Sequence, residues 1–288
     1  MNLNIAIFGG DKRNYYMAEV LEKRGYQIFR YGLCSYDDEL KSCSGEMEDS
    51  LSSIMNQADV FIGPIPFSKD GHTIYSSGNK VIEIDDFCKY IKKGDLIFGG
   101  NISPLVQKIS LERKSFCYDY LKVEDIALKN AVSTAEGAIA EAIIESDINL
   151  YQSNCLVLGY GKCGKALANR LYHFGAYVTV AARKEVQLIE VANNHLQPLL
   201  LDKLERKITQ FDFIFNTIPA QVLEESLIQL VKKECLIIDI ASMPGGTDFD
   251  ACKARGIKAI LSLGIPGRYA PKSSAEILVQ SIEHLLHL

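Results

Sequence analysis

Residues 154–184 of the chain read NCLVLGYGKCGKALANRLYHFGAYVTVAARK. An apolar run at 155–158 ends in a glycine turn, a helical pattern follows, and a second apolar run covers 177–181. The turn has the spacing G-x-G-x-x-G: the first glycine allows the tight turn, the second admits a pyrophosphate, and the third lets the helix pack on the strand. The stretch therefore predicts a dinucleotide-binding unit. We expect the contacts to come from Gly159, Tyr160, Gly161, Lys162, Cys163 and Gly164.

The end of the second apolar run indicates which dinucleotide binds. An Asp or Glu there would bind the ribose 2′-hydroxyl of NAD, whereas a cation accommodates the 2′-phosphate of NADP. The chain carries Arg183 and Lys184 at this point and no carboxylate. Because Arg183 can pair with phosphate and Lys184 adds a second charge, we expect NADP, with NAD as the alternative. The other interpretation is that both are solvated surface cations.

Length and composition narrow the class of protein. The 288 residues, 48% hydrophobic and 23% charged, are typical of a globular protein with one large or two ordinary domains. The net charge is −5 and no basic cluster is interleaved with aromatic residues, so we expect no nucleic-acid partner. No basic-then-apolar leader and no apolar run near the roughly 20 residues of a membrane span is present. We therefore expect a cytoplasmic protein.

The cysteines predict neither a metal site nor a redox pair. Eight are scattered along the chain without a C-x-x-C motif, which is the spacing that zinc sites and redox dithiols use. We expect them to be reduced, mostly buried thiols. They are Cys34, Cys43, Cys88, Cys117, Cys155, Cys163, Cys235 and Cys252.

Apolar runs alternate with helical patterns throughout the chain, which is typical of an α/β fold. The sequence predicts two Rossmann-like, doubly wound parallel-sheet domains joined by long helices. Residues 151–270 form the NAD(P)-binding domain, and 1–130 form a flavodoxin-like substrate domain, because its first turn, residues 9–13, lacks the dinucleotide spacing. The expected strands lie at 4–8, 27–31, 60–63, 96–99, 155–158, 177–181, 213–216, 236–240 and 258–262.

Two helices are expected to connect these domains. Residues 131–150 have helical apolar spacing, and the capping-box pattern at 133–136 predicts a helix start there. A last helix at 271–288, with a second such pattern at 273–276, is expected to pack back on the first domain. We expect the cleft between the domains to hold the chemistry. The apolar face of the last helix also makes a homo-oligomer plausible.

Several further motifs carry a family resemblance. They are Gly-Gly-Asp-Lys-Arg at 9–13, Asn-Ala at 130–131 with Thr-Ala-Glu-Gly-Ala at 134–138, Asn-Thr-Ile-Pro at 216–219, Ile-Ala-Ser at 240–242 with Pro-Gly-Gly-Thr-Asp-Phe at 244–249, and Pro-Gly at 266–267 with Ala-Pro-Lys at 270–272. Together they resemble the family of dipicolinate synthase A subunits from sporulating bacteria, from the first strand to the last helix. The Pro-Gly-Gly-Thr-Asp-Phe run is far more specific than the glycine fingerprint.

This resemblance implies a reaction, a compartment and a partner. The reaction is oxidation of 2,3-dihydrodipicolinate, a small dicarboxylate, to dipicolinate with NADP⁺ as hydride acceptor. The compartment is the mother cell of a sporulating bacterium, and the partner is the flavoprotein-like B subunit of the same synthase.

Such a reaction requires cations and helix starts that hold a dianion against the nicotinamide. Arg13 could clamp one carboxylate and Lys272 the other, although both could be surface cations. Thr134 and Ser242 are further candidates for binding substrate, and Glu136 is the candidate proton acceptor or hydrogen-bond organiser, with simple helix capping as its alternative. We expect the nicotinamide ribose to meet Asn216, Thr217, Ile218 and Pro219.

Two other functions share these features. A generic two-domain NAD(P)-dependent dehydrogenase of the hydroxy acid or shikimate type has the same cofactor domain, but Ser242 and the Gly-Ile-Pro-Gly run at 264–267 depart from the hydroxy acid pattern. A noncatalytic NADP-binding protein that supports the B subunit is the second alternative, because a cofactor fold does not prove turnover.

Overall fold

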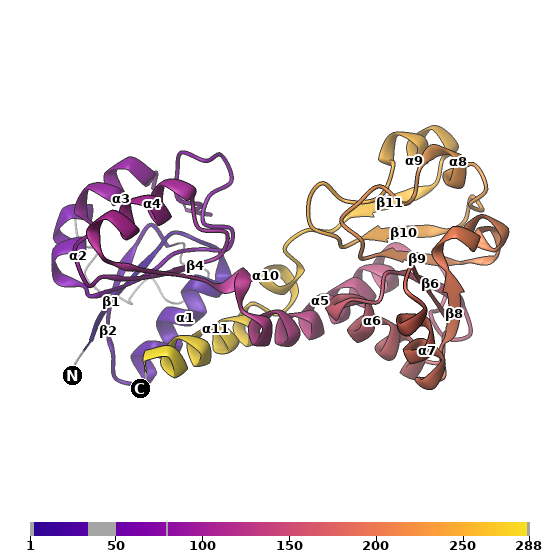
Figure 1. The fold of residues 1–288 in the computed structure, drawn as a ribbon, viewed down its shortest axis with the longest axis horizontal. Helices are drawn as coiled ribbons and strands as arrows, with labels where there is room; N and C mark the ends of the chain where they lie inside the picture. The colour runs from indigo at the N-terminus through magenta and orange to yellow at the C-terminus, as the bar shows by residue number, and fades with distance from the viewer. Residues whose placement is uncertain (1–2, 34–49, 79, 287–288) are drawn as a thin grey trace. The chain divides into compact units, whose positions relative to one another are not determined.

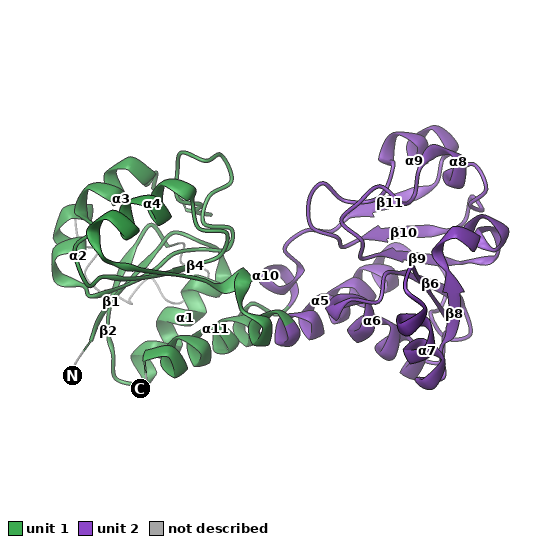
Figure 2. Ribbon diagram, in the orientation of Figure 1, with its two compact units in different colours: residues 1–127, 270–288 green, residues 128–269 purple. Residues whose placement is uncertain are grey.

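A computed structural model describes residues 3–33, 50–78 and 80–286. Cys34 and Cys43 therefore lie outside the described residues. The chain divides into two compact units (Figure 2): unit 1 comprises residues 1–127 and 270–288, and unit 2 comprises residues 128–269. Each unit is a parallel-sheet α/β fold, which confirms the predicted fold class.

Unit 1 contains a five-stranded parallel sheet with the strand order β2-β1-β3-β4-β5. Alternate residues of each strand point to opposite faces, so Ile5 and Ile7 pack under α1 and α11, whereas Ala6 and Phe8 face α2, α3 and α4 (Figure 1). The strands are β1 (Asn4–Phe8), β2 (Gln27–Tyr31), β3 (Val60–Ile62), β4 (Leu96–Gly99) and β5 (Phe116–Asp119). The helices are α1 (Lys12–Lys23), α2 (Leu51–Gln57), α3 (Ile84–Tyr90), α4 (Pro104–Arg113) and α11 (Pro271–Leu286).

Unit 2 contains a six-stranded parallel sheet with the order β11-β10-β9-β6-β7-β8. Val157 and Phe215 belong to the core under α5, α6 and α7, and Leu158 and Ile214 belong to the core under α8 and α9. The strands are β6 (Asn154–Leu158), β7 (Tyr177–Ala182), β8 (Gln197–Leu200), β9 (Phe213–Asn216), β10 (Leu236–Asp239) and β11 (Lys258–Leu261). The helices are α6 (Lys162–His173), α7 (Glu185–Asn193), α8 (Glu225–Ile228), α9 (Phe249–Arg255) and α10 (Ile265–Tyr269).

Helix α5 (Glu124–Glu145) corrects the predicted helix at 131–150 at both ends. Residues 124–127 of this helix belong to unit 1, and residues 128–145 belong to unit 2. The capping-box pattern at 133–136 lies inside the helix: Ser133 is buried, and the Thr134 hydroxyl donates to the carbonyl of Asn130, one turn back (2.9 Å). Acidic Glu124 and Asp125 occupy the first turn instead, where they suit the helix dipole.

Helix α11 begins at Pro271, two residues before the expected box at 273–276. Proline is favoured in the first helical turn because its missing N–H has no partner there anyway. Buried Leu278 and Ile282 pack in the same core as Met17 and Leu21 of α1, so the last helix is part of unit 1.

Candidate functional site

A cleft with a volume of about 350 Å³ lies at the carboxyl ends of β6, β7 and β9 in unit 2. In parallel sheets of this kind, ligands bind at that edge. Nearly the whole predicted fingerprint contributes to its wall. The lining residues are Gly159, Tyr160, Gly161, Lys162, Cys163, Ala182, Arg183, Gln187, Thr217, Ile218 and Pro219.

Each of the three fingerprint glycines is required, or favoured, for a different structural reason. Gly159 has a φ of +93°, which side chains rarely tolerate. A Cβ on Gly164 would lie 2.2 Å from the carbonyl oxygen of Gly159, so any side chain there would force α6 away from β6. A Cβ on Gly161 would meet no atom within 4 Å and would project into open space at the cleft wall. The turn is therefore a cradle with room for a ligand at its second glycine.

The start of α6 suits an anionic ligand. Gly161 is its N-cap residue, and no side chain caps the helix. The first N–H groups of a helix carry a partial positive charge and have no partner within the helix. Because Gly161 keeps the approach open, a pyrophosphate fits this position, and the residues present fit a dinucleotide.

Of the two cations that follow β7, only Arg183 lines the cleft. Lys184 is the exposed N-cap residue of α7 and is not among the lining residues. Gln187, one turn further along, lines the cleft as well, and its Nε2 donates to the carbonyl of Tyr160 (3.4 Å). Sequence reasoning missed Gln187, since no motif marks that position.

Tyr160 fastens the glycine turn to α7. Its side chain is buried, and its hydroxyl accepts from Nδ2 of Asn194 at the long distance of 3.5 Å. Lys165 Nζ lies 5.3 Å from the ring centroid and pairs with Glu190 at 2.7 Å. Burial raises the pKa of Tyr160, and nearby Glu190 adds to the shift. The phenol is therefore a structural group here.

The loop after β9 forms the opposite wall, but Asn216 itself is not among the lining residues, contrary to the contact expected for it. Asn216 is fully buried, its Oδ1 accepts from the N–H of Ile218 and its Nδ2 donates to the carbonyl of the same residue (both 3.1 Å). Both ends of the amide are thus used to shape residues 217–219. Thr217 Oγ1 donates to the carbonyl of Leu158 (2.8 Å), which fixes the loop on β6.

Asp239, at the end of β10, organises the neighbouring loop and was missed by the sequence analysis. Its fully buried carboxylate accepts from the N–H groups of Ala241 and Gly246 (both 3.0 Å) and from Oγ1 of Thr247 (2.8 Å). A Cβ on Gly246 would lie 2.6 Å from Asn216 Nδ2, so the two loops pack closely. A carboxylate at a strand end before a Gly-Gly-Thr turn was the available signal. Ser242 is exposed in this loop and does not line the cleft.

The two candidates on α5 have other neighbours. Thr134 lies beside Cys163 in the first turn of α6; burial raises the pKa of the Cys163 thiol, and Thr134 only partly offsets the rise. Glu136 is exposed, and its carboxylate pairs with Arg170 on the outer surface of α6 (3.4 Å). Neither residue is among those lining the cleft, so the structure brings neither of them to the cofactor position.

In unit 1, Arg13 is buried and largely used within the protein. Its Nε and Nη2 donate to the carboxylate of Asp11 (2.9 and 2.7 Å), and Nη2 also donates to the carbonyl of Ile65 (2.6 Å). One edge of the guanidinium is therefore occupied by Asp11, and the carboxylate clamp expected for Arg13 stays a prediction for the rest of the group. Lys272 is exposed in the first turn of α11.

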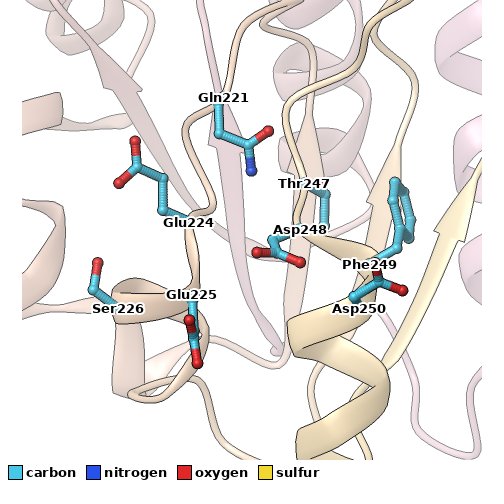
Figure 3. Close-up of a pocket in the computed structure, with 8 residues that line it drawn as sticks. All are labelled: Gln221, Glu224, Glu225, Ser226, Thr247, Asp248, Phe249 and Asp250. Atoms are coloured by element: carbon cyan, nitrogen blue, oxygen red, sulfur yellow. The ribbon is translucent and has the colours of Figure 1, made fainter.

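A second depression in unit 2, of about 680 Å³, has the opposite charge (Figure 3). Its lining residues include Glu224, Glu225, Asp248 and Asp250, from α8, α9 and the residues just before them, and none of the lining residues is basic. Such a surface repels phosphates, whereas no carboxylate is among the residues that line the cleft beside Arg183. Among the described residues, no group of three metal-ligating side chains comes together, and no helix is long and apolar enough to cross a membrane.

The six described cysteines are free thiols. Burial raises the pKa of Cys155 and of Cys235 to about 12 each, so both stay protonated at neutral pH. They are packing residues of the unit 2 cores.

Comparison with known proteins decides the family. Residues 4–121 match the family model described as the N-terminal domain of the dipicolinate synthase A subunit, and residues 138–255 match that of shikimate / quinate 5-dehydrogenase. The dipicolinate synthase A subunit of Bacillus subtilis (strain 168) is 31% identical over 288 residues, covering 99% of this chain and 96% of that protein. This chain belongs to the dipicolinate synthase A subunit family. The resemblance expected from the motifs is thereby confirmed.

Solved structures agree with this assignment. The dipicolinate synthase A subunit from Bacillus halodurans has a TM-score of 0.88 at 27% identity, over 100% of this chain and 99% of that one. The Bacillus subtilis A chain has a TM-score of 0.84 at 28% identity, over 100% and 96%. A transhydrogenase from Sinorhizobium meliloti, at 13% identity and a TM-score of 0.69 over 98% and 94% of the two chains, shares the fold alone. The protein thus has a dehydrogenase-type fold of the kind that binds nicotinamide cofactors, and its family name implies a second type of subunit.

Proposed function

We propose that this protein oxidises 2,3-dihydrodipicolinate to dipicolinate, with NADP⁺ as the hydride acceptor. The observation that carries the proposal is the cleft formed by the glycine turn of residues 159–164 and Arg183, in a chain of the dipicolinate synthase A subunit family. When bound, the nicotinamide supplies a carbon that accepts a hydride. The substrate passes that hydride to NADP⁺ and releases one proton to water, and its ring becomes aromatic.

The charge of the cleft supports NADP over NAD. The lining residues include Lys162 and Arg183 and no carboxylate, and Arg183 follows β7, where an NAD enzyme places an acidic residue for the ribose. A guanidinium can pair with a 2′-phosphate through parallel N–H donors. The residues in this cleft hold and orient the dinucleotide: the start of α6 takes the pyrophosphate, and residues 217–219 cover the side toward β9.

Substrate binding is proposed for unit 1. Arg13 remains a candidate through the part of its guanidinium that Asp11 and Ile65 do not use, and Lys272 is an exposed cation at the start of α11. Ser242, Thr134 and Glu136 stay predictions from the sequence. Their substitution tests whether they take part in turnover.

A coupled assay tests this function. The dihydrodipicolinate precursor is generated enzymatically, and the purified chain is added with NADP⁺ or NAD⁺, with and without the B subunit. Dipicolinate formed by this chain alone with NADP⁺ supports the proposal. Product that requires the B subunit would make the chain one part of a composite enzyme or a noncatalytic NADP-binding protein. No product in any mixture would favour a generic two-domain dehydrogenase and contradict the proposal.

A further inference from the structure

The sheet of unit 1 has a topological switch point, the place where the order of its strands reverses. In the order β2-β1-β3-β4-β5, the chain leaves β1 toward one side and returns to β3 on the other, so the sheet changes direction between these strands. Ligands of open α/β sheets bind outside the carboxyl ends of the strands at such a point. Here the position lies between the turn after β1, which includes Gly10, and the loop after β3, which includes Ile65.

The side chain of Arg13 spans this position. It leaves the first turn of α1, and its Nη2 donates to the carbonyl of Ile65 beyond β3 (2.6 Å). Asp11 holds Nε and Nη2 and therefore fixes the orientation of the guanidinium. No hydrogen bond joins Nη1 to any residue that the structure describes. The Nη1 group of Arg13 thus lies beside the switch point as a donor without a partner among the described residues, in a guanidinium whose orientation Asp11 fixes.

Asn14 adds a second donor at the same turn. The residue is only 3% exposed, yet its Nδ2 has no hydrogen-bond partner among the described residues. The amide lies directly behind the glycine turn, because a Cβ on Gly10 would be 2.3 Å from the Cγ and Oδ1 atoms of Asn14. Buried polar groups are nearly always hydrogen-bonded, so a buried donor with no partner among the residues that the structure describes points to an acceptor outside them.

Resting on the proposed function, we propose that Asn14 Nδ2 and Arg13 Nη1 together bind one carboxylate group of the dicarboxylate substrate. A carboxylate supplies several acceptor positions, which matches two donors from neighbouring residues. Asp11 caps the start of α1 and offsets much of the charge on Arg13, so the two donors themselves select the carboxylate. Asn14 is thus a residue that selects for a carboxylate at this end of the substrate.

The substitution Asn14→Leu removes the donor at similar volume. We expect the affinity of the full-length chain for pyridine-2,6-dicarboxylate, measured by calorimetric titration, to fall at least about 10-fold, the effect of losing one hydrogen bond to a charged group. The affinity for NADP⁺ should not change, and the melting temperature should stay level or rise, because an unpaired buried donor disappears. Asn14→Asp is a second variant, which keeps the shape and repels the carboxylate. Asn4→Leu is the matched control at the opposite end of β1, where Nδ2 already donates to the carbonyl of Gln57.

The possible outcomes separate the inference from the proposed function. Wild-type binding that weakens in Asn14→Leu and Asn14→Asp but not in Asn4→Leu supports the inference. Wild-type binding that persists unchanged in both Asn14 variants overturns the inference alone. If the wild-type chain binds no pyridine-2,6-dicarboxylate while it still binds NADP⁺, the proposed function fails, and this inference fails with it.

Discussion

Substitutions at two of the fingerprint glycines should have different effects: one should weaken cofactor binding and leave stability unchanged, and the other should lower stability. In Gly161→Ser, the new Cβ meets no atom within 4 Å, and serine is a good N-cap residue, so α6 should keep its place. The side chain would nevertheless occupy the space at the start of α6 where a pyrophosphate would lie. Losing two charge-assisted hydrogen bonds costs about 3 kcal/mol, which corresponds to roughly 100-fold weaker binding.

Gly164→Ala is the matched control within the same motif. Its Cβ would lie 2.2 Å from the carbonyl oxygen of Gly159, well inside the 3.0 Å that real Cβ atoms keep. Because that neighbour is backbone, α6 must move, and overpacking of this kind costs about 1–3 kcal/mol. The melting temperature should therefore fall by about 3–9 °C in Gly164→Ala and by no more than about 2 °C in Gly161→Ser.

Calorimetric titration with NADP⁺ and a thermal melt of each variant provide the two readouts. The reasoning is refuted if Gly161→Ser binds NADP⁺ as tightly as the wild type, because the cleft would then not be the pyrophosphate site. It is refuted equally if Gly161→Ser melts as early as Gly164→Ala.

Three further predictions follow from single contacts. Arg183→Glu should weaken NADP⁺ binding at least about 10-fold more than NAD⁺ binding, through lost phosphate pairing and added repulsion, and equal losses in parallel titrations would contradict the assignment of Arg183. Asp239→Asn places an amide donor opposite the N–H of Gly246 and the hydroxyl of Thr247. Thermal melts should show that the free energy of unfolding falls by about 2–4 kcal/mol. The loss should be larger than in Thr247→Val, which removes only one of the three donors to Asp239. Burial raises the pKa of Asp212, but hydrogen bonds from Lys232 and Asn154 outweigh it and hold that pKa below its usual range. The Asp212 carboxylate therefore stabilises the folded protein above the unfolded pKa of about 4, and this stabilisation is lost as the pH falls through the folded pKa. The melting temperature of Asp212→Asn should accordingly depend less on pH below about 4 than that of the wild type. Parallel curves for the two proteins would show that the carboxylate contributes nothing.

The sequence predicted the strands and the glycine turn of unit 2 well because their signals are local. A tight turn, a close helix contact and an apolar strand each constrain only a few neighbouring residues, so β9 (Phe213–Asn216) was placed to the residue. Edge strand β5 (Phe116–Asp119) was not predicted, since its exposed Phe116 and terminal Asp119 do not form a buried apolar run.

Helix boundaries and polar side chains depend on distant partners, which a motif does not reveal. The capping-box pattern at 133–136 predicts a helix start from local residues alone. Helix α5 begins earlier, at Glu124, because burial of Ile126 and Ala131 stabilises the helical turns before the pattern. Asn216 was expected to face the cofactor, whereas its amide is used on Ile218. Arg13 was expected to be a free clamp, and Asp11, two residues away, already holds it.

The most direct test of the proposed reaction is its stoichiometry. The purified chain is mixed with NADP⁺ and freshly generated dihydrodipicolinate, and NADPH and dipicolinate are measured in the same sample over time. Direct hydride transfer predicts that the two products appear together in equal amounts, and that both form more slowly, still in equal amounts, in Gly161→Ser at limiting NADP⁺. Dipicolinate formed without NADPH, or NADPH formed without dipicolinate, would contradict the proposal that this protein passes the hydride from the substrate to NADP⁺.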